Sequence, residues 1–306
     1  MGWFDFSADS GNPGHNANPP PVTPPSTSPL RAGIYIRPWT ETGLTLSALT
    51  DLKPTVVRIN YPAFPLLLSG NLTEATRLVE LIEAEITRAR SIGALPLIVT
   101  TLKAIITPAT QFDFIHGSIP VSDYYGSVAK RFPGCAWEIG NEQEIISGGG
   151  DSPMDTSTYA YLFNLFSKTI RLYDPTAIFV TAGTSGFNYD WTQAVLALTK
   201  PDAVGVHPYG TNPIDYATAV WNLNARGPVW FTEFGLMNIT PQEVTDYFTH
   251  ARGVVPLAVL FCLSDLSADK ASGSMSGPEP FGLMTVTGIR RPCYDAAKIS
   301  YVVKNA

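Results

Sequence analysis

The sequence predicts an α/β protein: a single (β/α)8 (TIM) barrel over residues 31–306, preceded by an extended Pro-rich arm over residues 1–30. Eight short and nearly continuous apolar runs alternate with amphipathic segments after residue 30, a pattern typical of parallel strands buried on both faces. A (β/α)8 barrel usually has about 250 residues, which this region provides. A doubly wound open sheet is the alternative. Against it, no Gly-x-Gly-x-x-Gly turn follows the first run, and the sequence has no phosphate-binding loop motif.

The eight predicted strands are residues 32–39, 55–61, 94–101, 136–142, 178–183, 203–209, 229–235 and 256–264. Between them, apolar side chains recur at helical spacing, as at residues 78–86 and 159–170. The best-marked helix start combines Thr240 as N-cap, Pro241 at the first helical position and Glu243 as the capping-box partner, with Gly253 near the helix end. This alternation of strand and helix is what a barrel requires.

The arm differs from the rest of the chain in composition. Residues 1–30 hold seven prolines in a background of Ser, Thr, Asn and Gly, and Trp3, Phe4 and Phe6 form an aromatic tip. Such a segment reads as an extended polyproline linker with no core of its own. We expect it to dock onto a protein partner or a neighbouring subunit; a disordered tail is the alternative that composition equally allows.

Charge and apolar patterning exclude several classes of protein. The formal net charge is −6, so the chain has no basic excess with which to bind nucleic acid. The longest strongly apolar run, residues 254–263, is interrupted by Pro256 and is about half of the ~20 residues that a spanning helix needs, so no membrane insertion is expected. The N-terminus has no basic and apolar leader, so we expect no secretory signal and synthesis in the cytoplasm.

The cysteines and histidines predict neither a disulfide framework nor a metal site. Cys135, Cys262 and Cys293 are few, odd in number and widely spaced. The sequence contains no Cys-x-x-Cys and no clustered histidines, so a metal-dependent hydrolase lacks a ligand set.

Polar residues gather where the predicted strands end, which is where barrel enzymes carry their active sites. Arg58 and Asn60 end the second strand, Glu142 the fourth, His207 and Tyr209 the sixth, and Glu233 the seventh. Ionisable groups rarely point into a barrel without a partner or a function, because their desolvation costs several kcal/mol. Glu138 lies four residues before Glu142, roughly 13 Å deeper at ~3.3 Å per residue, and is expected to be a structural carboxylate.

These motifs resemble clan A of the retaining glycoside hydrolases. Residues 137–142 (WEIGNE) resemble the strand-four signature of that clan, and residues 232–235 (TEFG) resemble its strand-seven nucleophile motif. Residues 58–60 (RIN), 206–209 (VHPY) and the ending at residues 281–283 and 291–292 (FGL and RP) fit the same pattern. The resemblance covers residues 31 to about 300 and implies a retaining hydrolase of O-glycosidic bonds in a polysaccharide or oligosaccharide.

The resemblance also implies roles for the site residues. Glu142 would be the general acid and then the general base, and Glu233 the nucleophile of a double displacement. Asn141 would bond the 2-hydroxyl of the sugar, and the residues that line the substrate site would be Arg58, Asn60, His207 and Tyr209. No cofactor and no metal are implied.

The chain departs from the clan at the last strand. Many members carry a sugar-stacking tryptophan there, but residues 260–265 read LFCLSD, so Trp39 or Phe281 is the expected substitute. That departure, together with the arm, favours an alternative: a non-catalytic carbohydrate-binding or structural barrel in a larger assembly. The two interpretations are compatible, since a hydrolase that its arm tethers to an extracellular particle such as a virion needs no secretory signal.

Overall fold

The structure is a computed structural model that describes residues 29–38, 41, 43–61, 72–100, 102, 121–145, 153–265 and 280–302. The predicted arm therefore lies almost entirely outside the described residues, as does Trp39. The statements below concern the described ranges.

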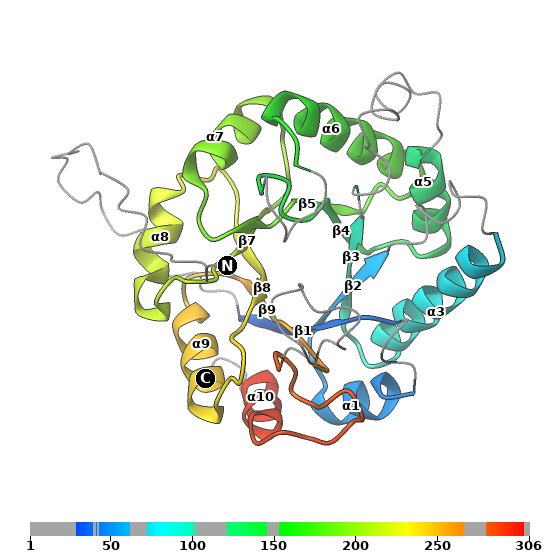
Figure 1. Cartoon of the computed structure of the whole chain (residues 1–306). Coiled ribbons are helices and arrows are strands. Elements are labelled where there is room, and N and C mark those ends of the chain that lie inside the picture. Colours follow the sequence, from blue (N-terminus) through cyan, green and yellow to red (C-terminus); the bar gives the residue numbers. More distant parts are fainter. Residues whose placement is uncertain are drawn as a thin grey trace, which may run out of the picture.

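Eight parallel strands form the barrel that the sequence predicts (Figure 1). They are β1 (Arg31–Ile36), β2 (Val56–Tyr61), β3 (Leu95–Thr100), β4 (Ala136–Ile139), β5 (Ile178–Thr181), β7 (Val204–His207), β8 (Val229–Phe234) and β9 (Leu257–Leu260). All eight predicted strands are confirmed, although the predicted carboxyl ends extend three residues too far at β4 and four residues too far at β9.

The barrel closes between β5 and β7. The strands follow one another in the order β5-β4-β3-β2-β1-β9-β8-β7-β6, where β6 (Thr184–Ser185) is a two-residue strand just beyond β5. An isolated parallel bridge joins Val180 of β5 to Ala203, and β6 pairs with the end of β7. The two ends of the sheet thus meet, and we refer to this contact as the β5–β7 seam.

Helices surround the strands (Figure 1). They are α1 (Thr45–Leu52), α3 (Leu72–Ser91), α5 (Val121–Arg131), α6 (Thr156–Tyr173), α7 (Tyr189–Leu198), the 3-10 helix η1 (Pro213–Asp215), α8 (Tyr216–Asn222), α9 (Pro241–Ala251) and α10 (Cys293–Val302). The predicted capping box is present at α9, where Thr240 and Glu243 bond each other's backbone N–H. Among the described helices, none has the length and apolarity to cross a bilayer.

Alternation along the strands divides the apolar residues into two cores. In β2, Val57 and Ile59 pack with the helices in the outer core, whereas Val56 belongs to a smaller core inside the barrel. The inner core also contains Tyr35, Leu97, Ala136 and Val180, among others. Because successive side chains point to opposite faces, Arg58 and Glu138 share the inner face with these residues. The fold therefore places charged groups inside the barrel.

Candidate active site

Arg58 and Glu138 form a buried ion pair on the inner face of β2 and β4. Arg58 Nε donates to Glu138 Oε2 at 2.7 Å. The relative exposure of the two residues is 1% and 0%, respectively. Glu138 Oε1 accepts bonds from Gly183 N at 3.0 Å and from Thr232 Oγ1 at 2.8 Å. Glu138 is thus a fully bonded carboxylate, as buried charges must be.

Glu142 reaches the site by a turn and not by an extension of the strand. β4 ends at Ile139, after which Gly140 and Glu142 adopt left-handed backbone conformations with φ of 85° and 50°. Glu142 N donates to Gly183 O at 3.0 Å, which fixes the turn beside the end of β5. The expected depth difference of roughly 13 Å between Glu138 and Glu142 is wrong, because both side chains contact His207.

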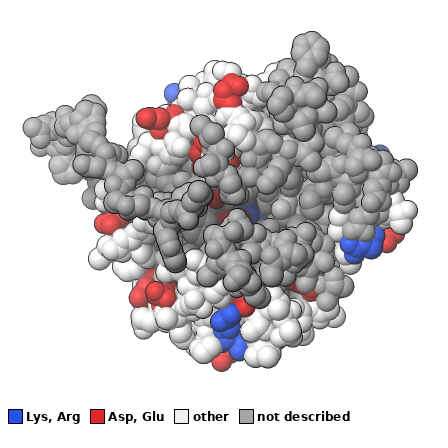
Figure 2. Space-filling model, in the orientation of Figure 1, with Lys and Arg blue, Asp and Glu red and all other residues white. Residues whose placement is uncertain are grey.

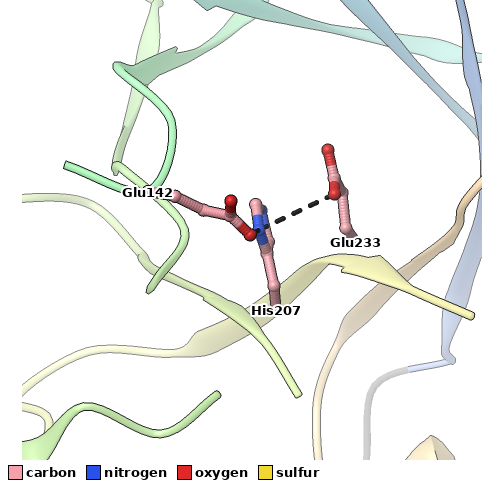
Figure 3. A group of neighbouring side chains, drawn as sticks. All are labelled: Glu142, His207 and Glu233. Carbon is pink, nitrogen blue, oxygen red and sulfur yellow. Dashed lines mark hydrogen bonds and ion pairs between the residues drawn. The ribbon is translucent and has the colours of Figure 1, made fainter. Parts of the chain in front are cut away.

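His207 lies between the carboxylates of the site (Figure 3). Its Nδ1 is 2.9 Å from Glu142 Oε1 and 3.7 Å from Glu233 Oε2, and its Nε2 is 3.6 Å from Glu138 Oε1. Gly183 leaves the room that this requires, since a Cβ there would lie 2.2 Å from Nε2 of the imidazole. Three carboxylates therefore face one fully buried imidazole.

Glu233, at the end of β8, accepts hydrogen bonds on both carboxylate oxygens. Arg58 Nη1 donates to Oε1, and Tyr209 Oη donates to Oε2 at 3.1 Å. Because both groups donate and Arg58 is cationic, they are suited to hold a carboxylate. Glu233 and Glu142 remain 8% and 9% exposed, whereas Glu138 is completely covered. In Figure 2, a few acidic and basic atoms are visible near the centre of the barrel face.

The ionisable groups at the centre of the site strongly shift one another's pKa values. Burial alone would raise the pKa of Glu138, but the charge and hydrogen bonds of Arg58 and His207 lower it to about 2. Burial alone would lower the pKa of His207, but Glu233, Glu138 and Glu142 raise it to about 10. His207 is therefore an imidazolium at neutral pH. Burial raises the pKa of Tyr209, and Glu233 and Glu142 raise it further, so its hydroxyl stays a proton donor.

Two asparagines were expected to line the site. Asn141 Oδ1 accepts from Arg58 Nη2 at 2.8 Å. A guanidinium has only donors, so the oxygen of the amide must face Arg58 and the NH2 group is left for another partner. Asn60, at the end of β2, hydrogen-bonds the buried Tyr35, which lies beneath the arginine.

The structure brings together six of the predicted site residues: Arg58, Asn141, Glu142, His207, Tyr209 and Glu233. We call these six residues and Glu138 the carboxylate site. Within the described ranges, the donor atoms of Glu142, His207 and Glu233 are the group that could share a metal ion, because they lie within 4.8 Å of one another. Arg58 already brings a positive charge to Glu233. We therefore assign no metal to the group.

An aromatic stack stands beside the carboxylate site. Phe261, directly after β9, stacks on Tyr35 with ring centroids 5.1 Å apart. It also forms a T-shaped pair with Phe281, with ring centroids 5.5 Å apart. Phe261 N donates to Phe234 O, next to Glu233 in the chain. The sequence predicted Phe281, but not Phe261, as a substitute for the missing tryptophan, although Phe261 is the first residue after the last strand.

A second buried polar cluster joins the ends of β1 and β9. Glu41 accepts from the backbone N–H groups of Arg37 and Ser264 and from the Ser264 hydroxyl, and Arg37 donates to Ser264 O at 2.6 Å. Asp265 binds Arg291 at 2.6 Å and Gly282 N at 2.9 Å. We call these residues the β1–β9 clamp. Both carboxylate oxygens of Asp265 accept hydrogen bonds within this clamp.

Comparisons with known proteins identify the fold. No protein-family profile matches the sequence, and no curated protein sequence matches it either. The structure is similar to GH5_18 from Streptomyces cattleya in complex with GlcNAc, with a TM-score of 0.67, 15% identity, and coverage of 89% of this chain and 80% of that chain.

Two further solved structures share the same architecture. A monomeric beta-xylosidase from Caulobacter crescentus CB15 has a TM-score of 0.65 and 14% identity, over 93% of this chain and 70% of that one. A GH30 endoxylanase from Clostridium papyrosolvens C71 has a TM-score of 0.63 and 12% identity, over 90% and 72%. The chain therefore has the (β/α)8 barrel of these glycoside hydrolases, and its chemistry has to be argued from its own side chains.

Proposed function

We propose that the chain is a retaining glycoside hydrolase that cleaves O-glycosidic bonds of a polysaccharide or oligosaccharide by double displacement. Glu233 is the nucleophile and Glu142 is the general acid and base. One observation carries the proposal: an oxygen of Glu142 and an oxygen of Glu233 lie within 4.8 Å of each other, and the two glutamates keep 9% and 8% of their surface exposed. Retaining enzymes hold their carboxyl groups about 5–5.5 Å apart, whereas inverting enzymes need roughly 6.5–9.5 Å to admit a water.

In the first step, a Glu233 oxygen attacks the anomeric carbon while Glu142 gives its proton to the departing glycosidic oxygen. The carbon–oxygen bond to the leaving sugar breaks as the bond to Glu233 forms, which leaves a glycosyl ester on the protein. Arg58 and Tyr209 each bind an oxygen of Glu233, so they orient the carboxylate without taking part in bond making.

In the second step, Glu142 accepts a proton from water, and the water oxygen attacks the anomeric carbon. Glu233 leaves as a carboxylate and Glu142 is protonated again, so the protein returns to its starting state. The contact between His207 Nδ1 and Glu142 Oε1 keeps this carboxyl on the leaving-group side in both steps.

Asn141 and Phe261 complete the proposed sugar site. The amide NH2 of Asn141 points away from Arg58 and can donate to the 2-hydroxyl, a contact that strengthens in the transition state. Phe261 offers an aromatic face supported from behind by Tyr35, and aromatic faces are suited to pack against the apolar side of a sugar. We assign the stacking role to Phe261 in place of the absent tryptophan.

A mechanism-based inhibitor tests the function. A panel of 2-deoxy-2-fluoro glycosides with a good leaving group is incubated with the full chain, followed by peptide mapping of the product. We expect one sugar of the panel to label Glu233 once per chain and to leave Glu233→Gln unlabelled. Release of product with inverted configuration, followed by NMR, or a label on another residue would overturn the proposal.

Two further measurements test the non-catalytic alternative and the proposed tether, one for each. Carbohydrate binding without turnover of any glycoside in a broad panel would favour the non-catalytic barrel. The tether is a proposal that rests on the composition of residues 1–30. Deletion of that segment should abolish attachment to a larger particle, such as a virion, and leave hydrolysis unchanged; attachment that survives the deletion would contradict it.

A further inference from the structure

Glu138 occupies the point where the two halves of the carboxylate site meet. It comes from β4, but its partners come from other strands: Arg58 from β2, Gly183 at the end of β5, Thr232 from β8 and His207 from β7. The side chain is completely buried, so no substrate can touch it. It nevertheless contacts the two residues that hold the catalytic carboxyls.

The first contact fixes Arg58. The guanidinium is planar, and its donors have a fixed mutual geometry. Glu138 binds Nε, which determines where Nη1 and Nη2 point, and these two nitrogens bind Glu233 and Asn141. A displacement of Glu138 would therefore move the donors that orient the nucleophile.

The second contact concerns His207. Glu138 Oε1 lies 3.6 Å from Nε2, while Nδ1 on the other side of the ring lies 2.9 Å from Glu142 Oε1. Gly183 N and Thr232 Oγ1 hold that same Glu138 oxygen in place. The imidazole is thus confined between a buried carboxylate and the proposed acid/base.

We propose that Glu138 is a positioning residue for both catalytic carboxyls, acting on Glu233 through Arg58 and on Glu142 through His207. This inference rests on the proposed function. The buried carboxylate of Glu138 also supplies negative charge to two groups, because it pairs with the guanidinium of Arg58 and lies 3.6 Å from the imidazole of His207. Among the described residues, Tyr159 also interacts with Glu138. Burial and the charge of Glu138 raise the pKa of Tyr159, so its hydroxyl stays neutral.

Glu138→Gln tests the inference, because it keeps the shape of the side chain and removes the charge. Loss of a buried negative charge disfavours cations and favours the ionisation of acids around it. We expect both limbs of the kcat/KM–pH profile to move toward lower pH by about one unit, together with a lower kcat. NMR titration of the full chain should show the His207 imidazole losing its proton at a pH lower by at least about one unit.

Glu85→Gln is the matched control. Glu85 is also a buried glutamate that binds a hydroxyl and a guanidinium, from Thr45 and Arg88, but it lies on α3 outside the barrel. We expect this variant to lose stability and to keep the wild-type pH profile. Glu138→Asp, which retains the charge and shortens the reach, should lower kcat with the limbs close to their wild-type positions.

The two readouts separate failure of this inference from failure of the proposed function. A Glu138→Gln protein that is less active, with both the pH limbs and the His207 titration unchanged, would show Glu138 to be a structural group only. If no glycoside is hydrolysed, the proposed function fails, but the His207 titration still decides whether Glu138 controls the imidazole. Should Glu138→Gln fail to fold, the kcat of Glu138→Asp decides, and a wild-type kcat in that variant would overturn the inference.

Discussion

The carboxylate site and the β1–β9 clamp are built from the same residue types, yet they use them differently. Each has a buried arginine beside a glutamate near the carboxyl ends of the strands. In the clamp, Glu41 is 0% exposed, and backbone N–H groups and a hydroxyl of two neighbouring segments bind it. In the carboxylate site, three carboxylates surround one imidazole: Glu138 on β4, Glu142 on the turn after it and Glu233 on β8. Glu142 and Glu233 are 9% and 8% exposed.

The pKa values of the buried glutamates also differ between the clamp and the carboxylate site. Burial raises the pKa of Glu41 despite the neighbouring charge of Arg37, whereas Arg58 and His207 lower the pKa of Glu138. The comparison teaches that a buried Arg–Glu pair does not identify a site. What marks the carboxylate site as a candidate is its excess of carboxylates around shared donors, and two of these carboxylates keep some exposed surface.

Removal of the proposed nucleophile should have the largest effect. Glu233→Ala leaves no group to form the glycosyl ester, so we expect kcat to fall by about 10⁴-fold or more. Glu41→Gln in the clamp should remain active under the same assay at pH 7. Steady-state rates on an activated aryl glycoside measure both; equal losses in the two variants would remove the distinction between the two clusters.

The proposed acid should show a smaller and substrate-dependent loss. Glu142→Gln cannot protonate the leaving group, so we expect a loss of about 10²–10⁴-fold on poor leaving groups and much less on good ones. A Brønsted plot across aryl glycosides measures this difference. A loss that is independent of the leaving group would contradict the assignment of Glu142.

The two buried glutamates should give stability profiles with opposite pH dependence. Because the pKa of Glu138 is lowered from 4.5 to about 2, its contribution to the free energy of unfolding, about 3 kcal/mol, is present above pH 4.5 and lost toward pH 2. Because the pKa of Glu41 is raised from 4.5, its contribution is present below that pH and lost as the pH rises through the folded value.

Urea unfolding between pH 3 and pH 7 measures these profiles. Relative to the wild type, Glu138→Gln should become more destabilised as the pH rises from 3 to 5. As the pH rises over the same range, the destabilisation of Glu41→Gln relative to the wild type should decrease. Parallel profiles for the two variants would show that the clusters do not differ in this respect.

The aromatic platform should give the smallest effect. Phe261→Ala removes a stacking surface worth about 0.5–1.5 kcal/mol, so kcat/KM should fall about tenfold or less, mainly through KM. Phe261→Trp should keep or improve it. Trp221→Ala, on the outer helix α8, is the control; an equal loss there would argue against a platform at Phe261.

The sequence predicted the barrel because its parallel strands are nearly continuous apolar runs. In the structure, the residues of these runs form the outer and the inner core. It could not predict the strand ends at the site, since the turn after β4 depends on the left-handed conformations of Gly140 and Glu142 and on the bond of Glu142 to Gly183. For the same reason, counting residues along a strand misjudged the position of Glu138 relative to Glu142.

Other parts of the site depend on contacts between distant segments. The motifs identified Glu142, Glu233 and their neighbours, but Gly183 and Thr232 were not singled out as partners of Glu138. Their signal was weak, because a glycine and a threonine at strand ends are common. The close approach of His207 to Gly183, which excludes any Cβ, is visible only in three dimensions.

The β5–β7 seam closes the barrel, and the same contact completes the carboxylate site. The Val180–Ala203 bridge and the β6–β7 pair bring the end of β5 beside His207, and Gly183 at that end bonds both Glu138 and Glu142. A chain that had formed every strand pairing except this one would contain a nearly complete sheet and all of the motifs. It would still lack the geometry in which the proposed proton donor, the imidazole and the proposed nucleophile meet, so closure of the barrel is also the step that would assemble the proposed active site.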